Sequence, residues 1–388
     1  MPKSSDHFIH AAMIILMLFG VIMVGSASMG VASGNNRYLV ITIAKQIIFV
    51  VAGYMAMTFL ANRFQLKKLK SSTMFFVILV TIFALLLCLL FTETRGARAW
   101  IRIPLGVTEV TLQPSEFAKI IAILVVTMYL GDNVRHYKST WDMMKRPVFI
   151  DGAMLLIVWL LQSDFGSMFV TLLIICVCLL VPNHPQLRKF QRGLTALFYI
   201  AVLVGIYMLS PAGEHLITKM TFLKTYQINR FIAAINPFSD QYGTGYQLIS
   251  GLISFSTGGW FGKGLGNSVR KYTSFPAAST DYILAIVVEE LGYVGFIALM
   301  LVYGFIIFRL LRYATKMRSE RGRIILVGTA MYFLIHIFLN IGGVTGLIPL
   351  TGVPLLMISA GGSSTMAVMA CVGVSQAVIA SYNRGEIR

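Results

Sequence analysis

Long, continuous apolar runs are the feature of this chain that most limits how it can fold. About ten of them are separated by polar segments, at residues 11–32, 39–62, 72–91, 114–131, 149–163, 165–182, 194–210, 281–308, 324–346 and 353–381. A helix of roughly 20 apolar residues crosses the hydrocarbon core of a bilayer. The runs are apolar throughout rather than alternating, which favours helices over the strands of a membrane barrel. The sequence therefore predicts an all-α polytopic membrane protein with about ten transmembrane helices.

The composition agrees with a chain that lies mostly in lipid. Hydrophobic residues make up 57% of the 388 residues and charged residues 12%, whereas a soluble domain carries about 25% charged residues. We expect a single transmembrane domain over residues 1–388. The four cysteines all fall in apolar runs, which indicates neither a disulfide framework nor a metal site.

The distribution of Lys and Arg predicts the orientation of the chain. The first run is longer than the apolar region of a secretory signal, about 7–15 residues, so we interpret it as an uncleaved span. With the N-terminus placed in the cytoplasm, 20 Lys and Arg residues fall in cytoplasmic segments and 10 in outer segments. Cytoplasmic loops collect positive charge, so both termini are expected in the cytoplasm. The net charge of +17 is thus explained by topology and needs no nucleic acid partner.

The segment 211–280, between the seventh and eighth runs, is predicted to be a large extracytoplasmic loop. Loops longer than about 12–15 residues are usually functional or disordered. This one is rich in Phe, Tyr and Trp, unlike a disordered segment, so we expect it to be folded, with amphipathic parts on the membrane surface. Its glycines at 258, 259, 262, 264 and 266 indicate tight backbone turns.

Asp281 stands where this loop meets the eighth run. A carboxylate at such a boundary keeps some hydration, and partial burial raises its pKa, which suits a general base. The alternative is a helix N-cap or first-turn carboxylate stabilised by the helix dipole. Spacing alone leaves both open.

Several other ionisable residues lie within the apolar runs, where they usually face a cavity or a partner. Glu289 and Glu290 point about 100° apart on a helix and are not expected to share one partner. Glu116 and Lys119 are three residues apart and can pair on one helix face. Asp164, between the fifth and sixth runs, is either a helix cap or an ion or proton site.

The outer segments contain basic residues against the general trend. They include Arg95, Arg98, Arg102, Lys263, Arg270 and Lys271. An anionic ligand on the outer face would explain them, and ordinary solvated loop charge is the alternative. Trp100 lies beside the arginines and either belongs to an interfacial aromatic belt or stacks on a sugar ring or prenyl chain.

A series of short motifs follows one another along the chain. They are Gly96-Ala97-Arg98-Ala99-Trp100-Ile101, Gln113-Pro114-Ser115-Glu116-Phe117-Ala118-Lys119, Gln162-Ser163-Asp164-Phe165-Gly166-Ser167, Asn236-Pro237-Phe238, Gly245-Tyr246-Gln247, Gly258-Gly259-Trp260-Phe261-Gly262, Thr280-Asp281-Tyr282, Glu289-Glu290-Leu291-Gly292, Gly346-Leu347-Ile348-Pro349, Thr351-Gly352 and Gly361-Gly362-Ser363-Ser364. Each is weak alone, but in this order they are specific. On these motifs the chain resembles the SEDS family, the FtsW/RodA/SpoVE group, over nearly its whole length. The segment 264–268 is more similar to the cell-division members than to the rod-shape members.

The resemblance implies an inverting peptidoglycan glycosyltransferase of the cytoplasmic membrane, active at the division septum. Its implied substrate is lipid II, an undecaprenyl-pyrophosphate-linked disaccharide-pentapeptide. Asp281 matches the family's essential aspartate, with the implied role of general base towards the acceptor sugar hydroxyl. The outer basic residues and Trp100 are expected to bind substrate. Glu116, Lys119, Asp164, Glu289 and Glu290 are expected to line its cavity.

The resemblance also implies partners and an ion. A class B penicillin-binding protein, as transpeptidase, and other division proteins are the expected partners. A divalent ion, Mg or Mn, is expected, with its ligands unknown, and no organic cofactor is expected.

The sequence departs from the family pattern near the expected base and near the last span. Ala99 replaces a frequent Arg, while Ala277 and Ser279 replace the usual Glu and His. Leu356, Met357 and Ala360 replace the usual Pro, Phe and Tyr. Asp281 itself is retained, so we expect activity.

Two other functions remain open from the sequence. A lipid II flippase would depend more on intramembrane charges such as Lys45, Glu116 and Asp164 than on Asp281. A non-catalytic scaffold of the division machinery would need no single acidic residue.

Overall fold

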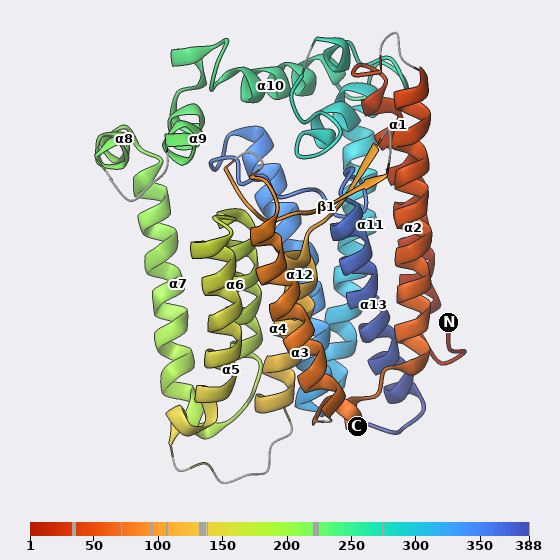
Figure 1. Cartoon of the computed structure of the whole chain (residues 1–388), viewed down its shortest axis with the longest axis vertical. Coiled ribbons are helices and arrows are strands. Elements are labelled where there is room, and N and C mark those ends of the chain that lie inside the picture. Colours follow the sequence, from red (N-terminus) through yellow and green to blue (C-terminus); the bar gives the residue numbers. More distant parts are fainter. Residues whose placement is uncertain are drawn as a thin grey trace.

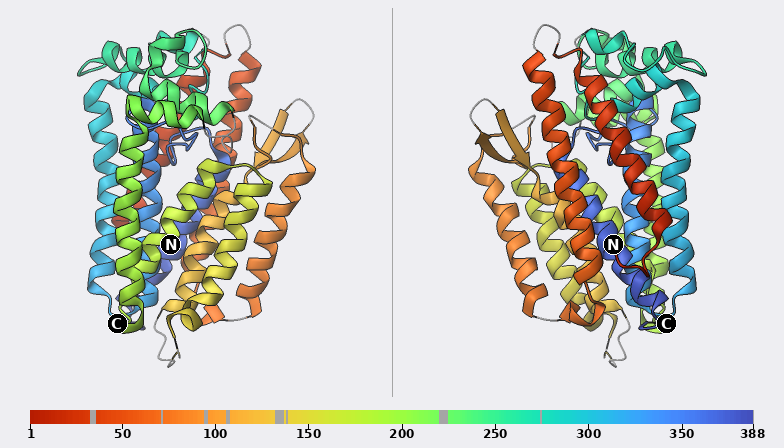
Figure 2. Two further views of the ribbon diagram at one scale, coloured as in Figure 1. Left: turned by 90° about the vertical axis from the view of Figure 1, so that its left-hand side faces the viewer. Right: turned by 90° about the vertical axis from the view of Figure 1, so that its right-hand side faces the viewer.

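The computed structural model is a bundle of long, roughly parallel helices with a folded cap over one end (Figures 1 and 2). The residues it describes are 1–32, 36–70, 72–93, 96–105, 108–131, 137, 139–219, 225–273 and 275–387. The marked chain ends lie in the half of the molecule away from the cap (Figure 1).

Each predicted span corresponds to a helix in the described part of the chain. The helices are α1 (His7–Ser28), α2 (Asn36–Arg63), α3 (Ser72–Leu87), α4 (Pro114–Leu130), α5 (Thr140–Leu156), α6 (Phe165–Leu180), α7 (Arg188–Met208), α11 (Ile283–Lys316), α12 (Glu320–Thr345) and α13 (Gly362–Asn383). Three short 3₁₀ helices, η1 (Leu66–Lys70), η2 (Cys88–Leu90) and η4 (Pro185–Leu187), and one π-helical segment, η3 (Ile157–Leu161), join or extend them in the described residues. The all-α polytopic fold is confirmed.

The helices differ in length and in how much of their surface is buried by the rest of the protein. Within the described residues, seven are long and apolar enough to cross a membrane, namely α1, α2, α3 with η2, α7 with η4, α11, α12 and α13. The other three are shorter. Almost every residue of α4 is buried, so protein rather than lipid surrounds this helix and allows it to carry Glu116 and Lys119.

The cap is formed by the segment 211–280, predicted as a folded loop. It contains α8 (Pro211–Thr218), α9 (Thr225–Ile235), η5 (Pro237–Asp240), α10 (Tyr246–Gly258) and η6 (Arg270–Tyr272). Its helices lie across the end of the bundle, roughly perpendicular to the spans (Figure 1).

Two elements differ from the sequence-based expectation. A small antiparallel hairpin, β1 (Ile101–Leu105) and β2 (Thr108–Leu112), precedes α4 and was not predicted. The last span was expected over 353–381, but α13 begins only at Gly362, and the residues 346–361 are not helical. Leu355, Leu356, Met357 and Ile358 are completely buried within the bundle. The apolar run that looked like the start of a helix is therefore a buried irregular segment, which we call the 346–361 segment.

The long helix α11 is interrupted at Gly292, where φ is 70°. The cap backbone fills this break: Lys263 N donates to Glu289 O at 2.9 Å, and Tyr293 N donates to Gly259 O at 2.9 Å. Gly259, Gly262, Gly264 and Gly266 all have positive φ, as the predicted tight turns require. The glycine-rich turn and the broken helix thus satisfy each other's backbone groups and attach the cap to the bundle.

Replacing Gly292 by alanine is expected to destabilise the protein. A Cβ there would lie 2.3 Å from Trp260 O, and the left-handed backbone costs a non-glycine residue about 1–2 kcal/mol before that clash is relieved. The matched control is Gly205→Ala in α7, where a Cβ meets nothing within 4 Å. Thermal unfolding in detergent should show a lower Tm for Gly292→Ala and an unchanged or higher Tm for Gly205→Ala. Equal Tm values for the two variants would contradict this account.

Candidate functional site

Asp281 lies at the junction of the cap and the bundle, in a turn that precedes α11. The turn is closed by Thr280 N and Tyr282 N, which both donate to Ala277 O, at 3.0 and 3.1 Å. The N-cap of α11 is Tyr282, which makes no side-chain cap bond, and the first turn contains no acidic residue. The helix-cap alternative for Asp281 is therefore wrong. Its side chain is only partly buried, so water and ligand can reach it.

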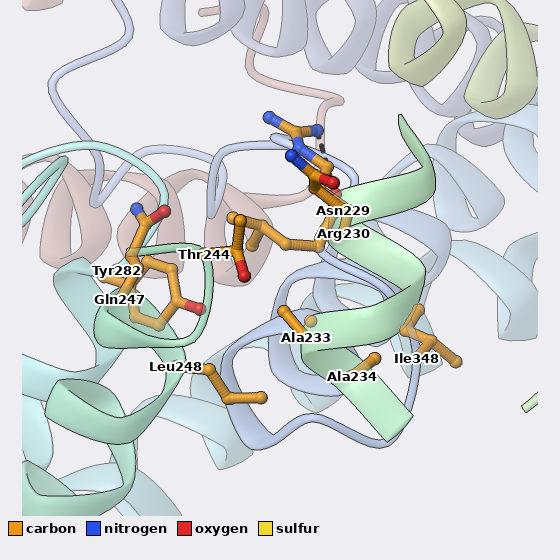
Figure 3. A pocket seen from close by; sticks show the side chains of 11 residues that line it. Asn229, Arg230, Ala233, Ala234, Thr244, Gln247, Leu248, Tyr282 and Ile348 are labelled. Carbon is orange, nitrogen blue, oxygen red and sulfur yellow. Dashed lines mark hydrogen bonds between the residues drawn. The ribbon is translucent and has the colours of Figure 1, made fainter. Parts of the chain in front are cut away.

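A pocket of about 180 Å³ opens beside this turn (Figure 3). Tyr282, Gln247 and Leu248 form one side, and α9 with Arg230 and Ala233 forms the other. Cap helices, α12 and the 346–361 segment all contribute, so the pocket exists only where cap and bundle meet. The full lining is Asn229, Arg230, Ala233, Ala234, Thr244, Gln247, Leu248, Tyr282, Gly343, Ile348 and Leu350.

Arg230 projects from α9 over the pocket and is held by the 346–361 segment. Its Nη1 donates to Leu350 O at 2.8 Å. A Cβ placed on Gly352 would lie 3.5 Å from Arg230 Nη1 and 3.8 Å from Asp281 Oδ2. The guanidinium and the carboxylate therefore converge on the same glycine. Sequence analysis counted Arg230 among the basic residues of the loop but did not assign it to the site.

Thr244 reaches the pocket from a turn that Asp240 organises. Asp240 accepts hydrogen bonds from Gly243 N at 3.0 Å and Thr244 N at 2.7 Å. The backbone N–H of Thr244 is the largest cause lowering the pKa of this carboxyl; slight desolvation opposes it, and the Thr244 hydroxyl and the Gly243 N–H add to it. The ionised carboxylate of Asp240 therefore stabilises this turn through its hydrogen bonds.

Glu289 and Glu290 each have their own lysine partner from the cap, as predicted, but against the prediction they also share Ser268. Lys263 Nζ lies 2.8 Å from Glu289 Oε1, and Lys271 Nζ lies 2.9 Å from Glu290 Oε1. Ser268 links the two pairs, because its hydroxyl donates to Glu289 at 2.6 Å and its N–H lies 3.4 Å from Glu290. We call these five residues the cap latch.

The latch changes how the expected substrate-binding lysines are interpreted. Lys271 is completely buried and also donates to Gly266 O at 2.6 Å and to Ser26 Oγ of α1 at 3.1 Å. Its ammonium is directed into the protein and not towards the pocket. Lys263 is one-third exposed, and Arg270 is half-buried next to the latch. None of the three lines the pocket.

The expected residues around Trp100 lie on the β1–β2 hairpin and its approach, and none of them lines the pocket. Arg98 is exposed, and Trp100 is half-buried. Arg102 Nη1 lies 3.9 Å from Glu109 Oε2 across the hairpin, a partly exposed pair. Arg95 lies outside the described residues.

Glu116 and Lys119 form the predicted i, i+3 ion pair, with Lys119 Nζ 2.7 Å from Glu116 Oε1. Both side chains are buried at the centre of the bundle. Asp164 is the N-cap of α6: one carboxylate oxygen accepts from Ser167 N at 3.1 Å and the other from Gln113 Nε2 at 2.8 Å. The structure therefore supports the cap alternative for Asp164.

Among the described residues, no group of three or more His, Cys, Asp or Glu side chains is arranged to hold a metal ion. Asp281 has a guanidinium close by, which disfavours a cation at the same carboxylate. The residues present do not form a ready site for the expected divalent ion, which stays a prediction.

The fold and site define a polytopic membrane protein in which an acid and an arginine approach the same glycine, beside a pocket beneath the cap. A family profile, FTSW_RODA_SPOVE, described as "Cell cycle protein", matches residues 6–384, and the chain belongs to this family.

Curated relatives carry a common name. A "Probable peptidoglycan glycosyltransferase FtsW" of Francisella salina is 32% identical over 93% of this chain and 86% of its own length. One of Bacillus subtilis is 31% identical over 96% of this chain and 90% of its own length.

Solved structures share the fold. A chain of a peptidoglycan synthase complex, described as coordinating polymerization and crosslinking, superposes with a TM-score of 0.72 at 23% identity, covering 98% of this chain and 99% of that one. The rod shape determining protein RodA of Thermus thermophilus gives 0.65 at 22% identity, covering 98% of both.

Breaking the buried half of the cap latch is expected to cost stability. Lys271→Met leaves Glu290 buried without its cation, and removing one partner of a buried pair costs about 3–5 kcal/mol. The double variant Lys271→Met, Glu290→Gln should recover part of this loss, because no unpaired charge remains. Lys263→Met is the matched control and should cost less, since Lys263 is one-third exposed and water can replace its ammonium, whereas Lys271 is fully buried. Thermal unfolding in detergent measures all three, and a double variant less stable than Lys271→Met would exclude this role.

Proposed function

We propose that this chain is a peptidoglycan glycosyltransferase that polymerises lipid II, with Asp281 as general base. The observation that carries the proposal is the convergence of Asp281 and Arg230 beside a pocket under the cap. Membership of the family, and relatives at about 30% identity over most of the chain named as peptidoglycan glycosyltransferases, support the activity.

The reaction needs a base on one side of the anomeric carbon and a leaving diphosphate on the other. The Asp281 carboxylate takes the proton from the acceptor sugar hydroxyl as that oxygen bonds to the anomeric carbon of the donor. The bond from this carbon to the diphosphate oxygen breaks, undecaprenyl diphosphate leaves with the electron pair, and the configuration inverts. Arg230 supplies positive charge at the pocket, where negative charge develops on the leaving group.

The pocket limits which part of the substrate can be enclosed. Its volume of about 180 Å³ is below the roughly 300–1,000 Å³ of common ligand pockets. It fits a single sugar or the diphosphate, so the pentapeptide and the prenyl chain are expected to lie outside it. No step is assigned to the expected Mg or Mn ion.

The partner and location follow from the relatives. A class B penicillin-binding protein as transpeptidase is supported by the structural neighbour, whose complex couples polymerization to crosslinking. The division names of the relatives support a septal location. The excess of Lys and Arg in the segments assigned to the cytoplasm supports two cytoplasmic termini, with the cap outside.

The flippase alternative is weakened by how the intramembrane charges are used. Lys45 donates to Glu109 O, Glu116 is paired with Lys119, and Asp164 caps α6. All of these charges have partners within the protein, which leaves none of them directed at a substrate path.

Asp281→Asn is expected to abolish glycan synthesis without unfolding the protein. A general base contributes about 10²–10⁴-fold to a rate, and asparagine keeps the shape but cannot accept the proton. The measurement is polymer formed from labelled lipid II by the purified protein with its transpeptidase partner. Glu93→Gln, at an exposed acid outside the pocket, is the control and should keep the wild-type rate. Polymer formed equally well by Asp281→Asn would remove this residue from the mechanism, and lipid II crossing vesicles without polymer would favour the flippase.

Gly352→Val is expected to reduce the same rate by about tenfold or more, because the side chain would enter the space between Arg230 and Asp281. Gly385→Val is the control for backbone strain: φ is 73° at both glycines, but a Cβ at Gly385 meets nothing within 4 Å. Equal polymer synthesis by the two variants would show that filling the space between the acid and the guanidinium has no specific effect on the rate.

A further inference from the structure

One face of α12 carries three polar side chains spaced four residues apart: Tyr332, His336 and Asn340. All are almost completely inaccessible. Spacing by four places them in one row along the helix. Buried polar groups in a membrane bundle are costly unless they have partners, and each of these three has one. We call this row the α12 ladder.

The end of the ladder nearer the centre of the bundle contacts the buried ion pair of α4. Tyr332 OH donates to Glu116 Oε2 at 2.9 Å. Lys119 Nζ lies 3.1 Å from His336 Nε2 and 2.7 Å from Glu116 Oε1. The ion pair is therefore fixed against α12 at two points.

The contact with Lys119 determines which ring nitrogen of His336 carries the proton. An ammonium has only donors, so Nε2 must accept, and the ring proton of a neutral imidazole is then on Nδ1. Nδ1 lies 3.1 Å from Pro354 O, in the 346–361 segment, and donates to it. His336 thus connects the ion pair directly to that segment.

The other end of the ladder reaches the expected base. Asn340 Nδ2 lies 2.9 Å from Val353 O and 2.9 Å from Asp281 O. Both partners are carbonyls, which assigns the amide nitrogen to this position. One side chain therefore holds the 346–361 segment and the backbone of Asp281 together.

The same segment also binds the two residues before Asp281. Ala360 N donates to Ser279 O at 2.8 Å, and Ser359 Oγ donates to Thr280 O at 2.8 Å. The carbonyls of three consecutive residues, 279, 280 and 281, are thus held by the segment or by Asn340. The position of the segment sets the position of the acid.

We propose that His336 and Asn340 are positioning residues for Asp281, and that the Glu116–Lys119 pair acts on the reaction through them. This inference rests on the proposed function. It gives the intramembrane ion pair a role in catalysis that requires no transport of substrate. The pair holds the α12 ladder in place, and the ladder holds the 346–361 segment. The segment in turn holds the turn that contains Asp281. Placement errors of about 1 Å cost up to about 10²-fold in rate.

The test compares kcat and KM for lipid II among full-length variants combined with the partner transpeptidase. His336→Ala and Asn340→Ala should lower kcat by about tenfold or more, with KM changed less than about twofold, because neither residue lines the pocket. His336→Asn places an amide near the Nδ1 position, keeps the Pro354 contact and should restore part of kcat, with the remaining loss due to the missing Lys119 contact. His336→Gln places its amide near the Nε2 position, keeps only the Lys119 contact and should not.

A control variant separates positioning from general loss of packing. Thr329→Ala, also on α12, removes a buried hydroxyl whose contacts are to Ile325 O and, on α13, to Cys371 Sγ at 3.2 Å and Ser375 Oγ at 2.7 Å. It should lower Tm without lowering kcat at a temperature where all variants stay folded.

Each outcome bears on one proposal. If wild type polymerises, Asp281→Asn does not, and His336→Ala and Asn340→Ala keep the wild-type kcat, the positioning role is wrong and the proposed function stands. Equal kcat for His336→Asn and His336→Gln would also overturn the positioning role. If Asp281→Asn is as active as wild type, the general base itself is wrong.

Discussion

Non-helical backbone buried in a membrane bundle must find its hydrogen bonds within the protein, because hydrocarbon offers none. The 346–361 segment is under this constraint, and much of the site follows from it. Side chains of α12 and α9 bind its carbonyls at Val353, Pro354 and Leu350. In binding them, Asn340 also takes the carbonyl of Asp281, and Arg230 is held beside the pocket.

The cap is attached by a second set of buried polar contacts. The break of α11 at Gly292 frees backbone groups that the glycine-rich turn of the cap binds. The cap latch lies next to this break and pairs two adjacent glutamates with two lysines. These charges are costly to bury and are tolerated because each is paired and hydrogen-bonded. The pocket lies between this cap and the bundle, so its shape depends on the latch as well as on its own lining.

Several features could be predicted from the sequence because their causes are local. Apolar runs of span length predicted the helices, and four of the five expected turn glycines, at 259, 262, 264 and 266, have positive φ. The i, i+3 spacing predicted the Glu116–Lys119 pair. The start of α13 was wrong, because apolarity reports burial and does not distinguish a helix from a buried irregular segment. The β1–β2 hairpin was missed because it is short and lies between spans.

The sequence by itself determined which stretches form the helices of the bundle, the large cap between the seventh and eighth of the apolar runs, and an acid at the boundary of cap and bundle. Only the tertiary structure decided which polar residues meet there. Lys271 looked like a ligand for an anion but pairs with Glu290, while His336, which no sequence pattern singled out, joins Lys119 to Pro354. Arg230 and Leu350 are 120 residues apart in the chain. The local run of apolar residues determines which stretches enter the membrane, because transfer to hydrocarbon depends on each stretch alone. The pairing of buried polar groups instead depends on how helices that are distant in the sequence pack together.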